Sequence, residues 1–102
     1  VVRFSKEELP AFAQWKNTAS ESDGYVTGLE PATDYPNAKP FERQQGRLVQ
    51  MAPGARYTAT LACEVHDTTE DVRKVEAEAA ALQQQAERTV HPAPVSRYSP
   101  GH

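Results

Sequence analysis

The side chain with the clearest potential for chemistry in this sequence is the carboxylate of Glu30. Glu30 ends a short segment with strand character, and Pro31 restricts it to an extended backbone. Gly28 precedes it by two residues, on the same face of such a strand, and leaves open space beside the carboxylate. That space is enough for a ligand to approach the backbone beside the carboxylate. Glu30 could equally be a strand-end glutamate in water or in an ion pair, and spacing alone favours this second interpretation.

Trp15 and Lys16 form a second candidate binding pair. An indole face can stack on the apolar face of a sugar ring, and a neighbouring ammonium group can donate hydrogen bonds to hydroxyls. The alternative, which residue statistics favour, is a core tryptophan beside a solvated lysine. Polar groups that could surround a ligand follow in a loop: Asp34, Tyr35, Asn37, Glu42 and Arg43. Most of them are expected to be ordinary loop residues, and Arg43 could pair with Glu42 or Asp34.

Short strands and a loop are expected to position these side chains. Residues 1–4 could form the end of a strand, and residues 25–30 contain the aromatic and β-branched types that favour one. Between them, Phe12 and Trp15 add apolar bulk before a polar surface loop. Residues 31–40 contain three prolines, so we expect an irregular loop there.

The clearest local pattern is a hairpin, with arms at residues 47–51 and 56–66 and a turn at residues 52–55. Apolar and polar residues alternate along the second arm, which predicts one buried face and one wet face. The buried face would hold Tyr57, Ala59, Leu61, Cys63 and Val65.

Beyond the hairpin the hydrophobic period changes to that of a helix, which Thr69 can cap and which we expect over about residues 70–88. Its thin apolar stripe predicts a surface helix. The stripe consists of Val72, Val75, Ala79, Leu82 and Ala86. The expected organisation is a β-rich part over residues 1–67, an amphipathic helix over residues 68–88, and an extended or disordered tail over residues 89–102.

Composition excludes several classes of protein. The chain has 102 residues and a net charge of −3, which argues against a surface for nucleic acid or for a membrane. No run approaches the ~20 apolar residues of a membrane span, and no signal peptide is visible. The single cysteine, Cys63, is expected to be a buried small hydrophobe. His66, His91 and His102 lack the spacing of metal ligands. We expect a cytoplasmic protein.

The only methionine is Met51, and the sequence opens with Val1. Because a natural chain begins with methionine, we expect a C-terminal piece of a longer protein. A chain of this size buries a modest fraction of its surface when it folds alone, so we also expect a partner or the rest of the protein to complete the fold.

Several motifs resemble one enzyme family. Residues 28–38, GLEPATDYPNA, place a strand-borne glutamate before a Tyr-Pro loop, and residues 48–65 contain a Pro-Gly turn followed by Tyr57. From about residue 4 to residue 66, this order is similar to the C-terminal part of the aldose 1-epimerase (galactose mutarotase) superfamily. More narrowly, Leu9-Pro10, Gln14-Trp15-Lys16 and Tyr25 to Pro31 resemble its poorly characterised epimerase-like branch, described as a domain of unknown function.

The resemblance implies a mainly β fold, the C-terminal portion of a galactose-mutarotase-like β-supersandwich, with one C-terminal surface helix. Residues 1–67 would be the sandwich part. The remainder of the sandwich would then be a partner of this chain.

The resemblance also implies an isomerase of carbohydrate metabolism. In the superfamily a glutamate takes the proton from the anomeric hydroxyl while a histidine protonates the ring oxygen, and the opened ring closes as the other anomer. Glu30 matches the base, whereas the histidine lies upstream of the matching region. The ligand would be a monosaccharide or sugar derivative, and no metal or other cofactor is implied. Substrate contacts are expected from Trp15, Lys16, Gly28 and Asn37.

Two other hypotheses stay open. The chain has Pro31-Ala32 where many mutarotases have Thr-Gln or Pro-Gln, which puts the usual hexose specificity in doubt. One alternative is a non-catalytic carbohydrate-binding protein with the same fold. The other is a structural β-module in which Glu30 has no chemical role.

Overall fold

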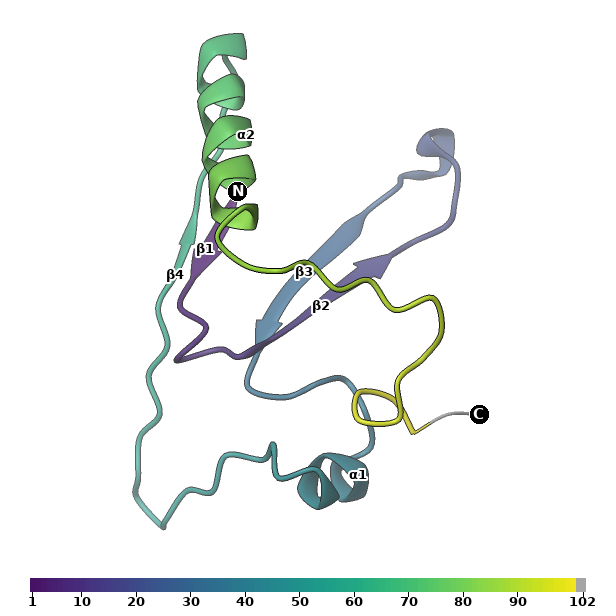
Figure 1. Ribbon diagram of the computed structural model, residues 1–102, viewed down its shortest axis with the longest axis vertical. Helices are drawn as coiled ribbons and strands as arrows, with labels where there is room; N and C mark the ends of the chain where they lie inside the picture. Colours follow the sequence, from purple (N-terminus) through teal and green to yellow (C-terminus); the bar gives the residue numbers. More distant parts are fainter. Residues whose placement is uncertain (101–102) are drawn as a thin grey trace.

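The computed structural model describes residues 1–100 of the protein (Figure 1). In chain order the elements are β1 (Val2–Phe4), β2 (Ala11–Lys16), the 3-10 helix η1 (Glu21–Asp23), β3 (Thr27–Ala32), α1 (Lys39–Gln44), β4 (Leu61–Cys63) and α2 (Thr69–Gln83). The longest element, α2, has 15 residues, and the longest strands have six. The fold is therefore mixed α/β with little regular structure, so the expected mainly β character is found only in part.

Strands β2 and β3 form an antiparallel ribbon, with Ala11 opposite Ala32 at one end and Lys16 opposite Thr27 at the other. The expected strand is thus present, but it begins and ends two residues later than its residue types suggest, because β2 sets its register. Pro31 lies within β3. It is tolerated there because β3 is an edge strand, so one side of its backbone needs no donor.

Strands β1 and β4 form a second antiparallel ribbon, in which Val2 lies opposite Cys63 and Phe4 opposite Leu61. The strand expected at the start of the sequence is confirmed. The ring of Phe4 stacks on that of Phe12 in β2, with 5.8 Å between the ring centroids. This contact joins the two ribbons, each of which has only two strands.

The hairpin expected over residues 47–66 is wrong, because only its turn forms. The turn closes through a 2.9 Å hydrogen bond from the amide of Ala55 to the carbonyl of Ala52. The second arm lies instead beside earlier parts of the chain. The amide of Thr60 donates to the carboxylate of Glu8 at 2.9 Å, and β4 pairs with β1. The first arm is drawn toward α1 by an ion pair described below.

Few apolar side chains are buried. Within residues 1–100, the buried hydrophobic residues are Leu9 and Ala11. The radius of gyration is 16.9 Å, against about 13 Å for a compact chain of 100 residues. The face of the second arm that was expected to be buried is open, since Val65 is 95% exposed and Cys63 is exposed. That expectation is wrong because no layer of the described chain packs against this face of β4.

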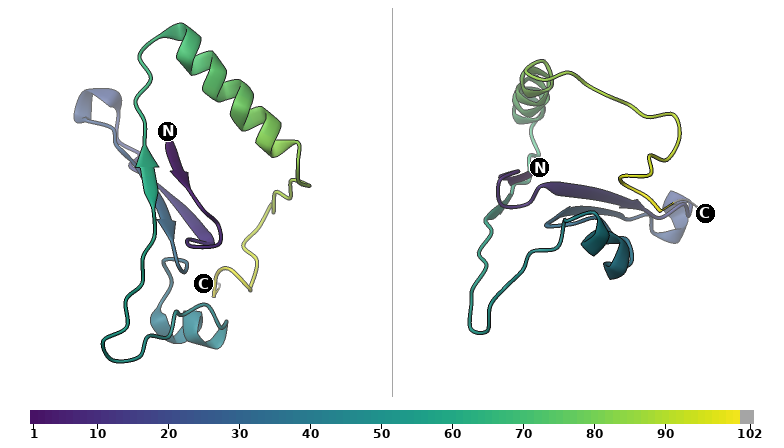
Figure 2. Two further views of the ribbon diagram at one scale, coloured as in Figure 1. Left: turned by 90° about the vertical axis from the view of Figure 1, so that its left-hand side faces the viewer. Right: turned by 60° about the horizontal axis from the view of Figure 1, so that its bottom comes forward.

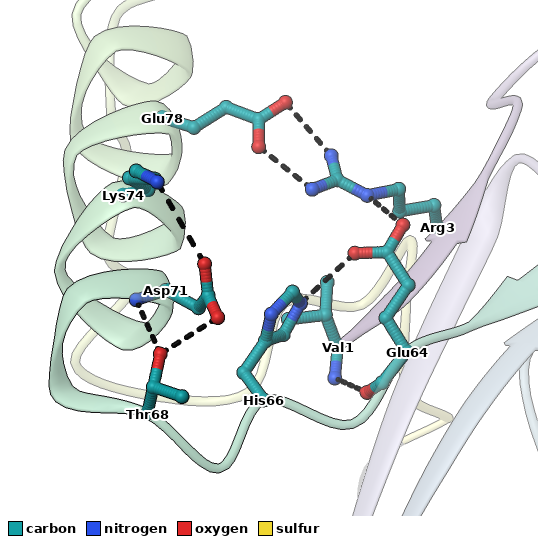
Figure 3. A network of polar contacts seen from close by, with 8 residues as sticks. All are labelled: Val1, Arg3, Glu64, His66, Thr68, Asp71, Lys74 and Glu78. Carbon is teal, nitrogen blue, oxygen red and sulfur yellow. Dashed lines mark hydrogen bonds and ion pairs between the residues drawn. The ribbon is translucent and has the colours of Figure 1, made fainter.

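Helix α2 lies on the surface, and none of its residues is buried. Its cap is Thr68, whose Oγ1 accepts a 3.1 Å hydrogen bond from the amide of Asp71, and the helix ends earlier than expected. Arg3 of β1 donates to both carboxylate oxygens of Glu78, at 2.8 and 2.7 Å, and so ties α2 to the β1–β4 ribbon (Figure 3). No helix of the described chain has the length and apolar character that crossing a bilayer requires.

Helix α1 lies at the end of the molecule opposite α2 (Figure 2). The loop expected over residues 31–40 is shorter than predicted, because its first two residues belong to β3 and its last two to α1. Pro40 fits the first turn of α1, where no backbone donor is needed. After α2 the chain returns to α1, where the ring of Tyr98 packs edge-on against Tyr35 at 5.5 Å between centroids. His102 and its neighbour lie outside the described residues.

Candidate functional site

Glu30 lies on one face of the β2–β3 ribbon together with Trp15 and Gly28. In the antiparallel register Ala13 is opposite Glu30, and Trp15 is opposite Gly28. Directly paired residues project from the same face, as do residues two apart along one strand. The structure therefore brings together three of the residues that the sequence nominates.

The carboxylate of Glu30 bends back over Gly28. An ideal Cβ built on Gly28 would lie 2.6 Å from Oε1 of Glu30 and 3.3 Å from Cβ of Trp15. The space beside Gly28 that the sequence assigns to a ligand is thus shared with the carboxylate itself. Glycine at this position sets where the acidic group can lie.

A hollow of about 210 Å³ opens beside Glu30. It is lined by Ala13, Glu30, Ala32, Asp34, Tyr35 and Pro36. The side chain of Glu30 is exposed, and within residues 1–100 it forms no ion pair. The carboxylate is therefore accessible to a ligand and has oxygens that can accept a proton.

Lys16 and Asn37, two other nominated residues, are not brought to Glu30. Lys16 directly follows Trp15 in β2, so it projects from the opposite face of the ribbon. The side-chain amide of Asn37 donates to Oε1 of Glu42 at 2.7 Å and to the carbonyl of Tyr98 at 3.0 Å. Through these bonds Asn37 connects the loop between β3 and α1 to α1 and to the tail.

Glu42 and Arg47 form a buried ion pair that the sequence analysis does not anticipate. Nε and Nη2 of Arg47 donate to the two carboxylate oxygens of Glu42 at 2.6 and 2.7 Å, and Glu42 is 1% exposed. The partner is Arg47 and not Arg43, because Gly46, with φ of 72°, reverses the chain after α1. A glycine directly before an arginine, just past a helical glutamate, is the signal that points to this pair.

The hydrogen bonds to Glu42 hold its pKa at about 2. The bond from Arg47 is the largest cause and that from Asn37 adds to it, while burial acts in the opposite direction. The pKa of Arg47 is raised, chiefly by its bond with Glu42. The guanidinium carbon of Arg47 also lies 5.2 Å from the ring centroid of Tyr35. The pair therefore fixes the loop that carries Tyr35, a wall of the hollow.

Among residues 1–100, no histidine lines the hollow beside Glu30. His66 contacts Glu64 at 3.1 Å, in the network that joins β1, β4 and α2 (Figure 3). The ring of His91 lies 6.5 Å from that of Tyr98. In the part of the chain that the structure describes, no three His, Cys, Asp or Glu side chains are grouped so that they could hold a metal ion.

Comparison with known proteins identifies a family. A family model described as a domain of unknown function (DUF4432) matches residues 1–65. This stretch contains both ribbons and α1, whereas α2 and the tail lie beyond it. No curated protein and no solved structure matches the sequence.

Proposed function

The chain belongs to the DUF4432 family, and we propose that it is an aldose 1-epimerase-like protein that interconverts the anomers of a monosaccharide or sugar derivative. Two things support this proposal: the likeness of residues 28–38 to the epimerase signature, and the position of one side chain. The observation that carries it is the accessible carboxylate of Glu30, which borders a hollow on the ribbon face that also presents Trp15.

In this proposal Glu30 is the general base. It takes the proton from the anomeric hydroxyl, and the exocyclic oxygen forms a carbonyl as the bond between C1 and the ring oxygen breaks. An acid delivers a proton to the ring oxygen at the same time. Rotation about C1–C2 and closure by the reverse steps give the other anomer and restore both groups. No histidine among residues 1–100 lines the hollow, so in this proposal the histidine of the superfamily mechanism comes from another part of the protein.

Trp15 is the proposed sugar platform. Its side chain is 53% exposed, on the same face as Glu30. An exposed indole offers an apolar face on which the C–H face of a pyranose can stack. Lys16 projects from the other face, so we do not include it in the proposed site.

We also propose that the two ribbons are parts of a larger β-sandwich. A two-stranded ribbon is marginally stable by itself in water, and both ribbons have unpaired edges within the described chain. The ribbon face opposite Glu30 presents Phe12 and Leu29, which are both exposed. A second layer packed on that face would bury these apolar side chains and leave the face of Glu30 for a ligand.

The second candidate is a carbohydrate-binding protein of the same fold without turnover. It is favoured by the absence of a histidine from the described residues that line the hollow. Both candidates require a sugar on the face of Trp15, and they differ only in whether Glu30 moves a proton.

The test is Glu30→Gln, which preserves the shape of the side chain and removes its basicity, with the exposed Glu87→Gln as control. We expect the wild type and the control to accelerate anomer exchange, measured by saturation-transfer NMR or polarimetry, and Glu30→Gln to show the buffer rate. Unaltered exchange in Glu30→Gln would contradict the role of Glu30. Sugar binding that depends on Trp15, without accelerated exchange in the wild type, would select the binding protein.

A further inference from the structure

A second, larger hollow lies on the same side of the β2–β3 ribbon as Glu30. Its volume is about 610 Å³. Its walls come from the turn before β2, the loop after β3, the segment after α1 and the tail. The residues used below are Lys6, Glu7, Ala11, Tyr35, Arg97 and Tyr98.

The larger hollow adjoins the one beside Glu30. Tyr35 lines both of them. Along the ribbon, the pair Ala11–Ala32 follows the pair Ala13–Glu30 on the same face. This step of two residues is about 7 Å, comparable to the size of one pyranose ring. Ala32 is half-buried and Ala11 is 3% exposed, so the two hollows meet at Tyr35 and not over Ala11.

The lining of the larger hollow is positively charged. Lys6 and Arg97 both line the larger hollow, both are exposed, and within residues 1–100 neither forms an ion pair. Glu7 is the one carboxylate among the lining residues. Arg47 also lines this hollow, but its charge is balanced by Glu42. The guanidinium carbon of Arg97 lies 5.8 Å from the ring centroid of Tyr98. Two cations without an ion pair, against one carboxylate, make this a local positive site in a chain of net charge −3.

We propose that the ligand is an anionic sugar, whose phosphate or carboxylate group binds Lys6 and Arg97 while its ring lies at Glu30 and Trp15. This inference rests on the function proposed above and adds the substrate class. A guanidinium group can donate two parallel hydrogen bonds to either anion, and an ammonium group adds a point charge. The rings of Tyr35 and Tyr98 pack edge-on against each other and together offer an apolar wall of the larger hollow to the sugar.

Binding measurements test the charge requirement. The probes are glucose 6-phosphate, glucuronate, glucose and inorganic phosphate, titrated into the intact protein by calorimetry. We expect one of the two anionic sugars to bind at least about tenfold more tightly than glucose, as one charge-assisted hydrogen bond would give. Glucose 6-phosphate and glucuronate separate the two anions, and inorganic phosphate shows what the anion contributes alone. Glucose binding as tightly as both anionic sugars would overturn the proposal.

Substitutions test the location. Lys6→Ala and Arg97→Ala should each weaken binding of the preferred anionic sugar by about tenfold, and Arg97→Lys should recover part of the loss. Arg73→Ala, which removes an equal charge from the exposed surface of α2, is the control and should bind as the wild type does. Equal losses of affinity in Arg73→Ala and Arg97→Ala would show a general effect of charge and would overturn the proposed site.

Glu30→Gln separates this inference from the proposed function. The variant should keep its affinity for the anionic sugar and lose anomer exchange. If affinity depends on Lys6 and Arg97 but Glu30→Gln still exchanges anomers, the catalytic proposal fails and the anion site stands. If Glu30→Gln loses exchange while Lys6→Ala and Arg97→Ala bind normally, the anion site fails and the catalytic proposal stands.

Discussion

Oε1 of Glu30 lies where a side chain at position 28 would begin, 2.6 Å from an ideal Cβ on Gly28. The two residues are therefore coupled: the glycine determines which rotamer the glutamate can adopt. A methyl group at position 28 would collide with the end of the flexible Glu30 side chain. We therefore expect the carboxylate to move and the backbone to stay in place.

Gly28→Ala should therefore reduce activity much more than stability. The displaced carboxylate no longer points as it does now, and a misplacement of about 1 Å can lower a rate by about a hundredfold. The backbone of Gly28 has no positive φ, so we expect the free energy of unfolding to change by less than about 1 kcal/mol. Anomer-exchange rates and thermal melts on the same samples check both parts. A large fall in stability with normal exchange would contradict the prediction.

Glu42→Gln should destabilise the loop between β3 and α1. The substitution leaves the half-buried Arg47 without its counter-charge, which is unfavourable. We expect a lower melting temperature and faster hydrogen exchange at the amide of Arg47, which bonds to the carbonyl of Glu42. Glu70→Gln on the surface of α2 is the control and should change neither quantity appreciably.

Lowering the pH should destabilise the folded state, because it protonates the carboxylates of the ion pairs. The pKa of Glu42 is held at about 2, and those of Glu64 and Glu78 are lowered, mainly by hydrogen bonds from Arg3. A carboxylate with a lowered pKa in the folded state adds stability above its ordinary pKa of about 4.5 and loses it as the pH falls. For Glu42 the loss should extend from about pH 4.5 to about pH 2. Melting temperature against pH, with Glu42→Gln showing a shallower decline, checks this prediction.

The cap of α2 allows a paired substitution. Thr68→Ala removes the bond that Oγ1 accepts from Asp71 and should cost about 1 kcal/mol of helix stability. Thr69→Ala, one residue along, leaves the cap intact and should cost less. Circular dichroism at 222 nm during thermal melting compares the two variants. A larger effect of Thr69→Ala would contradict the structure and show that Thr69, the residue expected from the sequence, is the cap.

Residues 1–102 by themselves should unfold broadly and at low temperature. Only Leu9 and Ala11 are buried hydrophobic residues in the described chain, so little apolar burial opposes the conformational entropy of the unfolded state. Differential scanning calorimetry of this polypeptide measures the width of the transition. A sharp, cooperative melt of a monomer would contradict the expectation.

Local patterns in the sequence identify the elements whose stability is local. The strand before Pro31 and the helix that contains Val72 and Val75 are found because alternation and helical spacing depend on neighbouring residues alone. The Pro-Gly turn near Gly54 is found for the same reason. The boundaries move by one or more residues because a strand partner and a cap residue decide them.

The missed features depend on contacts between distant segments. The second arm of the expected hairpin pairs with β1, about sixty residues earlier. No pattern among neighbouring residues indicates which strand it pairs with. Pro40 suggests a loop, yet a proline suits the first turn of a helix. Arg47 reaches Glu42 only because Gly46 turns the chain back. For the candidate site, the sequence places Gly28 and Glu30 on one face but cannot show that Trp15 joins them and Lys16 does not.

The tail is attached to the rest of the molecule through main-chain oxygens. Nη1 of Arg47 donates to the carbonyl of Arg97 at 2.7 Å, and Asn37 donates to the carbonyl of Tyr98. A carbonyl is present whatever the side chain is, so the identity of residue 97 can change without loosening this attachment. A substitution at position 97 should therefore change the charge of the larger hollow while the tail stays attached in the same geometry.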